Sequence, residues 1–500
     1  MAIPKIFGIE TEFGIQGVGG GESNPVIASS ILINAYSQES NDRVNWDFED
    51  ETPGNDARGF LNEGVFAPEV ETHLVNTVLT NGGRYYVDHA HPEYSSPECS
   101  CAREAVLYDR AGEQILIRSM RAAERLFGEQ GRIAVYKNNS DHKGNSYGCH
   151  ENYLMDREIA FAKIAKLITA HFVSRIIYTG SGKVGSETGI RKDERGLPIE
   201  YQISQRAEFF EEEVGLETTL KRPIVNTRDE PHCDPKRYRR LHVICGDANM
   251  SEVACYLKLG VTGIILSMIE DGWLDKTDLI LKSPVPQFHN LSTDISLKGT
   301  MELTSGRAIT ALEIQWAYYE IAEKYVHENG FSSIGEEKTG ANLMERWHQC
   351  LSNLEADPYR ANKTVDWVAK LELILAYMDR HNLTWDSQRL VAMDLQYHDL
   401  RPEKSLFTRL SMECLFDDEQ VKQAMTEPPP GTRAYFRGKC LQKWMGDIAT
   451  ANWDSLVFDL GDEPLKRIPT MDPLKGTYFH VGKLIEECAT PRQLLDKLES

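Results

Sequence analysis

Short strand-like segments alternate with long helical segments along this chain of 500 residues. Alternating apolar and polar side chains, which are typical of strands, occur near residues 5–15, 84–88, 132–137 and 240–246. Apolar residues with helical spacing occur near residues 103–128, 159–178, 251–270 and over most of 308–400. This mixture favours an α+β class, and 500 residues are too many for one compact core.

Two segments interrupt this alternation. Residues 41–80 are acidic, contain Pro and Gly and show no lasting periodicity, so we expect a long loop of the kind found in lids, binding loops or disordered stretches. Three prolines at 428–430 end the helical region and predict a hinge. We therefore expect a large domain over 1–425, with the loop as an insertion, and a small C-terminal domain over 426–500.

The chain is acidic: 55 Lys and Arg against 76 Asp and Glu give a formal net charge of −21. Such a surface repels nucleic acid and anionic membranes, so we expect neither as a partner, although the charge also serves solubility alone. No signal peptide is visible, and no apolar run is long enough for a membrane span. Ten cysteines without a metal-binding or disulfide pattern fit a reducing cytoplasm.

Glu10 and Glu12 lie two residues apart in the first predicted strand, so both carboxylates point to one face. Two carboxylates on one side repel each other unless a cation lies between them, and hard divalent cations prefer oxygen ligands. The pair is therefore a candidate metal site. An exposed strand face with two solvated acids would show the same pattern.

A second polar cluster, Asp88-His89-Ala90-His91-Pro92-Glu93, stands at the end of the 84–88 strand. Asp88 follows an apolar run, and partial desolvation would suit it as a base or nucleophile. Glu93 and the histidines could add metal ligands. The alternative is a surface turn rich in His, Pro and Glu.

A third candidate is the turn over residues 138–152. Gly144 and Gly148 allow close backbone approach, which is useful around a phosphate, and His150 lies where the chain re-enters regular structure. A polar hairpin is the alternative. Cys149 is not expected to act as a nucleophile with His150, because adjacent residues rarely face each other.

Positive charge gathers between residues 221 and 242, where seven Lys and Arg face three acidic residues. Arginine binds phosphate or carboxylate through its planar fork, so an anionic ligand is expected, with a solvated basic turn as the alternative. On the predicted strand Arg240 and His242 share a face, and Arg239 points away. The acids, imidazoles and arginines together suit a Mg-nucleotide that acts on a carboxyl or amide carbon.

Seven segments carry a resemblance to a known family: GIETEFG, NGGRYYVDHAHPEYSSPEC, YKNNSDHKGNSYGCHENYL, QISQRAE, NTRDEPHCDPKRYRRLHVICGDANM, TRAYFRG and WDSLVFDL. From Gly8 into the C-terminal segment, they resemble the family of the ligase and the deamidase/depupylase of prokaryotic ubiquitin-like protein (Pup). The resemblance implies a glutamine synthetase-like fold of the carboxylate–amine ligase superfamily. In it, a curved antiparallel β-sheet packed with helices cradles ATP and Mg²⁺, next to a small C-terminal domain.

The two branches of this family catalyse opposite reactions. Residues 45–60 resemble an insertion that the ligase lacks, and DHAHPEY and residues 215–232 also follow the deamidase branch. The resemblance therefore implies an ATP- and Mg²⁺-dependent hydrolase that converts the C-terminal Gln of Pup to Glu and cleaves the Pup–lysine isopeptide bond. The alternative is the Pup–protein ligase, which forms that bond with ATP hydrolysis. A Pup-binding module without turnover and a ligase of free amino acids are more distant alternatives.

The resemblance also implies roles for single residues. Asp88 matches the catalytic aspartate, as nucleophile or as general base. Positions that hold or adjoin Mg²⁺ are matched by Glu10, Tyr86, Glu93, His150 and His242. Positions that contact the nucleotide, either ATP or ADP plus phosphate, are matched by Arg84, Ser96, Arg240 and Trp453. Glu12 belongs to the first-strand carboxylate pair without an assigned role.

The implied partners are Pup and pupylated proteins, in a bacterial proteasome pathway. Because Pup is itself acidic and largely disordered, an acidic enzyme needs a basic groove to hold it. Candidates for that groove are Arg206, Arg222 and Arg228, followed by Arg433 and Arg437. The loop over 45–78 could cover the site and limit access to it.

Overall fold

The computed structural model describes residues 1–18, 24–40, 44–49, 51–59, 75–187, 196, 198–461 and 464–499. Its central feature is a 10-stranded sheet. In spatial order the strands are β13 (Tyr238–Val243), β8 (Cys149–Asp156), β1 (Phe7–Glu12), β6 (His91–Ser95), β5 (Arg84–Asp88), β4 (Asn76–Val78), β3 (Asn45–Trp46), β16 (Ile448–Ala451), β17 (Ser455–Phe458) and β18 (Lys466–Pro469). All neighbours pair antiparallel except β3 and β16, which run parallel.

Shorter strands form two-stranded pairs around this sheet. They are β2 (Gly14–Gly17) with β7 (Ile133–Tyr136), β9 (Lys183–Val184) with β10 (Tyr201–Gln202), β11 (Phe210–Gly215) with β12 (Arg222–Asn226), and β14 (Thr300–Glu302) with β15 (Ala308–Thr310). The strands expected from alternation near 5–15, 84–88, 132–137 and 240–246 are therefore present. The α+β class is confirmed.

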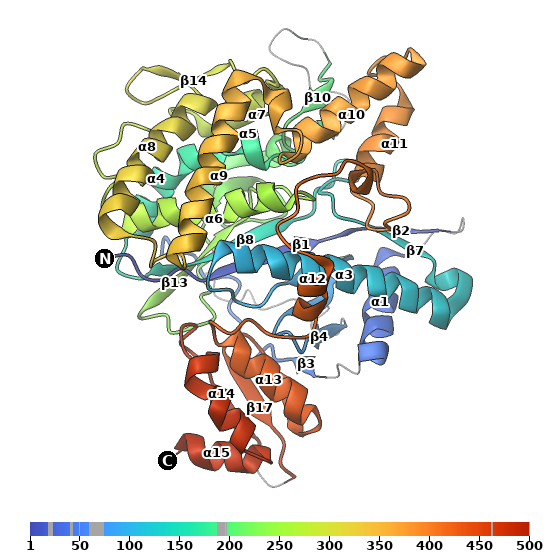
Figure 1. Ribbon diagram of the computed structural model, residues 1–500, viewed down its shortest axis with the longest axis vertical. Helices are drawn as coiled ribbons and strands as arrows, with labels where there is room; N and C mark the ends of the chain where they lie inside the picture. Colours follow the sequence, from blue (N-terminus) through green and yellow to red (C-terminus); the bar gives the residue numbers. More distant parts are fainter. Residues whose placement is uncertain are drawn as a thin grey trace.

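The helices form most of the remaining structure. They are α1 (Pro25–Ser40), α3 (Ala102–Phe127), α4 (Phe161–Ser174), α5 (Ile176–Thr179), α6 (Glu252–Glu270), α7 (Pro284–Thr293), α8 (Ala311–Asn329), α9 (Glu337–Ala356), α10 (Asp366–His381), α11 (Gln388–Tyr397), α12 (Asp418–Ala424), α13 (Ala434–Trp444), α14 (Tyr478–Glu487) and α15 (Pro491–Glu499). Helices α4 to α9 group above the sheet in Figure 1, and α13 to α15 lie at the opposite end of the molecule.

Helix α6 is the core helix of the large part of the molecule. Among the described residues it alone is long and apolar enough to cross a membrane, but that apolar stretch is entirely buried inside the protein. Its N-cap is Ser251, whose hydroxyl accepts a hydrogen bond from the Ala254 amide at 3.2 Å. Burial on all sides explains its apolar composition without a membrane.

The long loop expected over residues 41–80 is interrupted by strands at residues 45–46 and 76–78, whereas residues 47–49 and 51–59 form neither a helix nor a strand. Strands β3 and β4 belong to the central sheet, and Val44 and Trp46 are buried. These strands have two and three residues, too few for alternation to show in the sequence. Residues 41–43, 50 and 60–74 lie outside the described residues.

The C-terminal segment has its own apolar cluster but shares the central sheet. Residues of α13 to α15 and β16 to β17 pack together with Val44, Trp46 and Val78. The proline run 428–430 lies between α12 and α13, where no helix continues. Because β16 pairs with β3, the sheet runs on across the expected hinge. The division into domains at residue 425 stays a prediction.

Candidate active site

The register of the sheet places six of the expected site residues, together with Ser95, in two rows on one face. Residues directly opposite each other on neighbouring strands share a face, as do alternate residues along one strand. The first row, across β5, β6, β1 and β8, is Arg84, Ser95, Glu10 and His150. The second row, across β5, β6 and β1, is Tyr86, Glu93 and Glu12. Strand pairing thus brings together motifs that are distant in the sequence.

Glu10 is the centre of the first candidate metal cluster. Its Oε2 atom is 3.4 Å from His150 Nδ1 and 3.8 Å from His242 Nε2. Asn152 donates to Glu10 Oε1 at 2.8 Å, and Arg240 Nη1 lies 3.7 Å from that oxygen. Burial opposes ionisation of Glu10, but the two histidines and Arg240 outweigh it and hold its pKa well below the ordinary value. Burial lowers the pKa of His242, so its neutral ring can ligate a cation.

Three carboxylates form a second candidate metal cluster beside the first. Ligand oxygens of Glu12, Asp88 and Glu93 lie within 4.8 Å of one another. Burial and the charges of the neighbouring carboxylates raise the pKa of Glu93 well above its ordinary value. Burial, followed by the charge of Glu93, likewise raises the pKa of Tyr86. Crowded carboxylates of this kind repel unless a cation neutralises them, and their oxygen donors fit Mg²⁺.

Asp88 ends β5 at the tight turn into β6, where it pairs with His91. Its Oδ2 atom is 3.1 Å from His89 Nδ1, and its side chain is 27% exposed. Burial opposes ionisation of Asp88, but the hydrogen bond from His89 and the charge of His150 outweigh it and lower its pKa. An ionised carboxylate that reaches the cleft can act as a nucleophile or as a base toward water.

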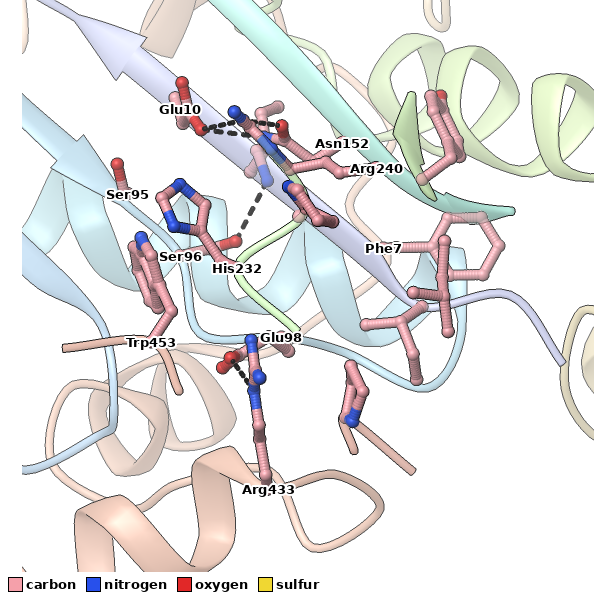
Figure 2. Close-up of a pocket in the computed structure, with 17 residues that line it drawn as sticks. Phe7, Glu10, Ser95, Ser96, Glu98, Asn152, His232, Arg240, Arg433 and Trp453 are labelled. Atoms are coloured by element: carbon pink, nitrogen blue, oxygen red, sulfur yellow. Dashed lines mark hydrogen bonds and ion pairs between the residues drawn. The ribbon is translucent and has the colours of Figure 1, made fainter. Parts of the chain in front are cut away.

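Two connected cavities lie over this face. The larger is a cleft of about 1090 Å³ lined by both clusters, and the smaller has about 80 Å³. Five residues line both: Glu10, Ser95, His232, Arg240 and Trp453. In Figure 2 the smaller cavity lies between β1 and the C-terminal segment, with Trp453 and Arg433 on one side and Phe7 on another. An elongated ligand could therefore place a flat apolar group in the small cavity and its charged end in the cleft.

The four residues expected to contact a nucleotide differ in placement. Arg240 and Trp453 line both cavities, whereas Arg84 lines the cleft and Ser96 the small cavity. The Arg84 guanidinium lies 4.0 Å from the ring centre of Trp46 and 3.9 Å from that of Tyr86. The buried Ser96 hydroxyl accepts from a backbone N–H of β1 and donates to the next carbonyl. It therefore shapes the cavity wall.

Arg206 and, from the basic segment, Arg222 and Arg228 all line the cleft. Arg206 is buried and donates to Ser146 Oγ at 3.3 Å, while Arg222 donates to the Ser146 carbonyl at 2.9 Å. Burial and the charge of Arg206 lower the pKa of Arg222 to about 10. Within the described part of the chain neither guanidinium forms a salt bridge with a carboxylate, so the pair fits an anion.

Arg433 and Arg437 are placed differently from the groove that the sequence suggested. Both bind Glu98, Arg433 Nε at 2.7 Å and Arg437 through Nη2. Burial opposes ionisation of Glu98, but the two arginines lower its pKa to about 2. They form an internal ion-pair cluster that joins α13 to the segment before α3.

The turn before β8 is shaped by the site itself. A Cβ atom on Gly148 would lie 2.4 Å from His150 Nε2 and 2.7 Å from Glu12 Oε1. Gly148 therefore leaves room for the site's own side chains. Cys149 is buried on the opposite face from His150, and burial raises the pKa of its thiol. The expectation that Cys149 is not a nucleophile agrees with this placement.

Sequence patterns did not single out His232, and for the 45–78 segment they indicated a position over the site without naming the residues that line the cleft. His232 lines both cavities, and Phe48, Glu51, Pro53 and Gly54 of the expected loop line the cleft. The Thr52 amide donates to Glu230 at 2.6 Å, which ties this segment to the turn before β13. An isolated histidine after a proline has no informative spacing, so the only available signal for His232 was its place within a segment that carried the family resemblance.

A mainly antiparallel sheet with carboxylate–imidazole clusters, an acidic residue at a strand end and facing arginines has the side chains with which an enzyme could hold a cation and act on an anionic group. Comparison with known proteins identifies the family to which the chain belongs. The model of the Pup-ligase protein family matches residues 5–457, and the chain belongs to this family.

Relatives from both branches match this chain. A depupylase of Acidothermus cellulolyticus is 48% identical, over 99% of each chain. A Pup deamidase/depupylase of Mycobacterium tuberculosis is 45% identical, again over 99% of each chain. A Pup–protein ligase of Acidimicrobium ferrooxidans is 41% identical, over 82% of this chain and 89% of its own.

Two solved structures of the ligase PafA have the same fold. The complex of Pup with PafA matches with a TM-score of 0.80 and 29% identity, over 99% of this chain and 95% of PafA. PafA in complex with ADP matches with a TM-score of 0.73 and 32% identity, over 82% of this chain and 89% of PafA. The glutamine synthetase-like fold implied by the sequence is confirmed.

Proposed function

We propose that the chain is a Pup deamidase and depupylase. It would hydrolyse the side-chain amide of the C-terminal Gln of Pup, and the isopeptide bond between Pup and a substrate lysine. One observation carries this proposal. In sequence alignments, relatives named depupylase or Pup deamidase/depupylase match 99% of this chain and of their own length at 45–48% identity, whereas two Pup–protein ligases match 82% of it at 38–41%.

Asp88 would carry the chemistry. Its ionised carboxylate attacks the carbonyl carbon, or removes a proton from the water that attacks it. In the first route an anhydride between Asp88 and the substrate forms as ammonia or the lysine amine leaves with a proton, and water then cleaves the anhydride to free Asp88 and the Glu carboxylate. In the second route the water oxygen adds to the carbonyl carbon, and the amine leaves with the proton that Asp88 accepted. Arg206 and Arg222, two cations at the cleft wall, would stabilise negative charge that develops on the carbonyl oxygen or hold the substrate's carboxylate.

The two clusters would hold Mg²⁺ through Glu10, His150 and His242 and through Glu12 and Glu93. Bound there, the ion would neutralise phosphate or carbonyl oxygens, as divalent cations do in such sites. Tyr86 would lie beside the second cluster. The carboxylate-rich donor set, the raised pKa of Glu93 and the room kept free at Gly148 support this assignment.

A nucleotide would occupy both cavities, because PafA, with the same fold, binds ADP. The base would enter the small cavity beside Trp453 and above Ser96, and the phosphates would extend toward Arg240 and the first cluster. Arg84 would contact a phosphate in the cleft. Amide hydrolysis needs no net ATP, so the nucleotide, ATP or ADP plus phosphate, would be retained.

Pup and pupylated proteins are the proposed partners, and PafA supports this because its complex with Pup has the same fold. Arg206, Arg222 and Arg228 would attract the acidic Pup chain into the cleft. Cytoplasmic location belongs to the same proposal, and all ten cysteines are unpaired in agreement with a reducing compartment.

The first test follows Pup and ATP together. Purified protein is incubated with Mg²⁺, ATP and Pup ending in Gln, and the mass of Pup is measured beside the ATP pool. A gain of about one mass unit with ammonia release and little ATP loss is expected, because an amide becomes an acid. Pup with a C-terminal Glu that becomes joined to a lysine, with one ADP formed per bond, would instead identify the ligase.

The second test replaces the reacting group. Asp88→Asn should lower turnover by at least about 10²-fold, because the amide neither attacks nor accepts a proton. Nucleotide binding, measured by calorimetry, should persist. The matched control is Asp275→Asn, which removes an exposed carboxylate paired with Lys163 and should keep wild-type turnover. Normal turnover of the Asp88→Asn variant would exclude both roles of Asp88.

A further inference from the structure

His232 stands where the two cavities meet. It lines both of them, together with Glu10, Ser95, Arg240 and Trp453. Figure 2 shows its ring near the labelled Ser95 and Trp453 side chains, and all three residues line the small cavity. Any ligand that extends from the small cavity into the cleft must pass this ring.

The backbone at His232 has an unusual conformation. Its φ of +48° lies in the left-handed region, which is unfavourable for a residue with a side chain. The turn is held in place because Arg240 donates to the Glu230 carbonyl at 2.7 Å and Glu230 accepts from the Thr52 amide. The surrounding structure therefore supports a strained residue at the cavity wall, where strain often accompanies function.

The His232 ring has polar atoms to offer. Within the described residues no hydrogen bond reaches either ring nitrogen, and the nearest opposite charge is Glu230, with Nε2 and Oε2 3.8 Å apart. Burial lowers the pKa of His232 to about 4 in spite of Glu230. At neutral pH the ring is uncharged, with one N–H donor and one nitrogen acceptor.

These properties indicate which part of a ligand meets the ring. The inference rests on the proposed nucleotide site, with the base in the small cavity and the phosphates in the cleft. The group between base and phosphates is the sugar. A phosphate would be matched by a cation, which Arg240 supplies, whereas a hydroxyl group both donates and accepts and matches a neutral imidazole.

We propose that His232 binds a ribose hydroxyl of the nucleotide and selects ribonucleotides over deoxyribonucleotides. Its role is that of a positioning and specificity residue, because it contacts the sugar and not the reacting carbon. A single neutral hydrogen bond of about 1 kcal/mol corresponds to roughly 5-fold in affinity. The preference should therefore be measurable and modest.

The test compares dissociation constants for ATP, 2′-deoxy-ATP and 3′-deoxy-ATP by calorimetry. The wild type should bind one of the two deoxynucleotides about 5-fold more weakly than ATP. In His232→Phe, which keeps a flat ring without ring nitrogens, ATP should weaken to the level of that deoxynucleotide, and the preference should vanish.

Two comparisons keep the outcome clear. Trp453→Phe changes an apolar contact at the same junction and should weaken all three nucleotides by one factor, so its preference for ATP should remain. His232→Asn tolerates the left-handed backbone and keeps a donor and an acceptor, so it serves if the Phe variant does not fold, and it should retain part of the preference.

Failure can be traced to its source. A wild type that binds all three nucleotides equally, or a folded His232→Phe variant that keeps the wild-type preference, would overturn the role of His232 and leave the proposed nucleotide site standing. A wild type that binds none of them would overturn the nucleotide site and this inference with it.

Discussion

Two carboxylates on one face of the sheet have pKa values that are shifted in opposite directions. Glu10 has two imidazoles and Arg240 beside it, and its pKa is held well below the ordinary value in spite of burial. Glu93, buried next to other carboxylates, has a pKa well above it. The neighbours that each strand register supplies cause this difference. Opposed shifts within one cleft are typical of a functional site.

Gly148 gives a residue-scale prediction. In Gly148→Ala the new Cβ would meet the ends of two flexible side chains, His150 and Glu12, which can move aside. We therefore expect little loss of stability, about 1 kcal/mol or less, and a large loss of turnover with a raised Mg²⁺ requirement. Turnover as a function of Mg²⁺ concentration and urea unfolding would measure both effects.

The matched control is Gly330→Ala at the end of α8. Gly330 has a φ of +71°, and a Cβ atom added there would have no other atom within 4 Å. Alanine at this position should therefore cost about 1 kcal/mol through backbone strain alone. Its turnover should equal that of the wild type. Wild-type turnover and Mg²⁺ dependence in Gly148→Ala would show that the two cluster residues need no such space.

The sequence could predict much of the site at this scale. Glu10 and Glu12 show their common face through spacing alone, and Arg240 and His242 do so too. The engaged hydroxyl of Ser96 and the ion pairs of Arg433 and Arg437 could not be predicted, because they depend on partners far along the chain. Residue type and family resemblance indicate a candidate, whereas the hydrogen bonds and ion pairs that engage it appear only in the folded structure.

At the scale of elements, long regular segments were predictable and short ones were not. Helices α3 and α6 and strands β1 and β5 show clear periodicity, and the structure places them where the patterns do. The order of strands in the sheet was not predictable. The parallel pairing of β3 with β16, for example, joins residues about 400 positions apart. No local pattern encodes such a pairing, because distant burial and hydrogen bonding determine it.

The described part of the insertion gives an element-scale prediction. From the sequence alone, deletion of residues 45–78 should change turnover far more than folding. Trp46, however, is only 4% exposed and packs against Trp453, with their ring centres 5.1 Å apart. We expect Trp46→Ala to lower the free energy of unfolding by about 3–5 kcal/mol.

Phe48→Ala separates the cleft wall from the core. Phe48 lines the cleft and is only partly buried, so its removal should alter turnover and cost less stability, about 1 kcal/mol. Urea unfolding and turnover of both variants provide the measurement. A Trp46→Ala variant as stable as the wild type would show that the segment around Trp46 is not part of the core. Deletion of residues 45–78 would then test whether this segment limits access to the site.

At the scale of the whole molecule, the C-terminal segment and the large part of the chain are joined at the small cavity. They share the sheet through β3 and β16, and they share an ion-pair cluster in which Glu98 binds Arg433 and Arg437. Trp453 of the C-terminal segment completes the cavity wall. Residues on both sides of the expected domain boundary therefore form one site, which makes the junction important for stability as well as binding.

Glu98→Gln tests this junction through its pH dependence. The pKa of Glu98 falls from its ordinary value near 4.5 to about 2 in the folded protein, so its ionised form stabilises the fold. That stabilisation is complete above about pH 5 and is lost as the pH falls from 4.5 toward 2. At pH 7 the variant leaves two buried arginines without a carboxylate and should lose about 3–5 kcal/mol. By about pH 4 the difference in free energy of unfolding between the variant and the wild type should be smaller by roughly 1 kcal/mol.

Urea unfolding at pH 7, 5 and 4 measures the difference in free energy of unfolding between the wild type and the Glu98→Gln variant. The contributions of other carboxylates cancel in this difference, because they titrate alike in both proteins. The control Glu302→Gln breaks the exposed pair with Lys282 and should cost less than about 1 kcal/mol at every pH. A difference for Glu98→Gln that stays constant down to pH 4 would mean that Glu98 is not held ionised by Arg433 and Arg437. A difference that narrows as expected would show that the two parts of the chain are held together by charge at the cavity they share.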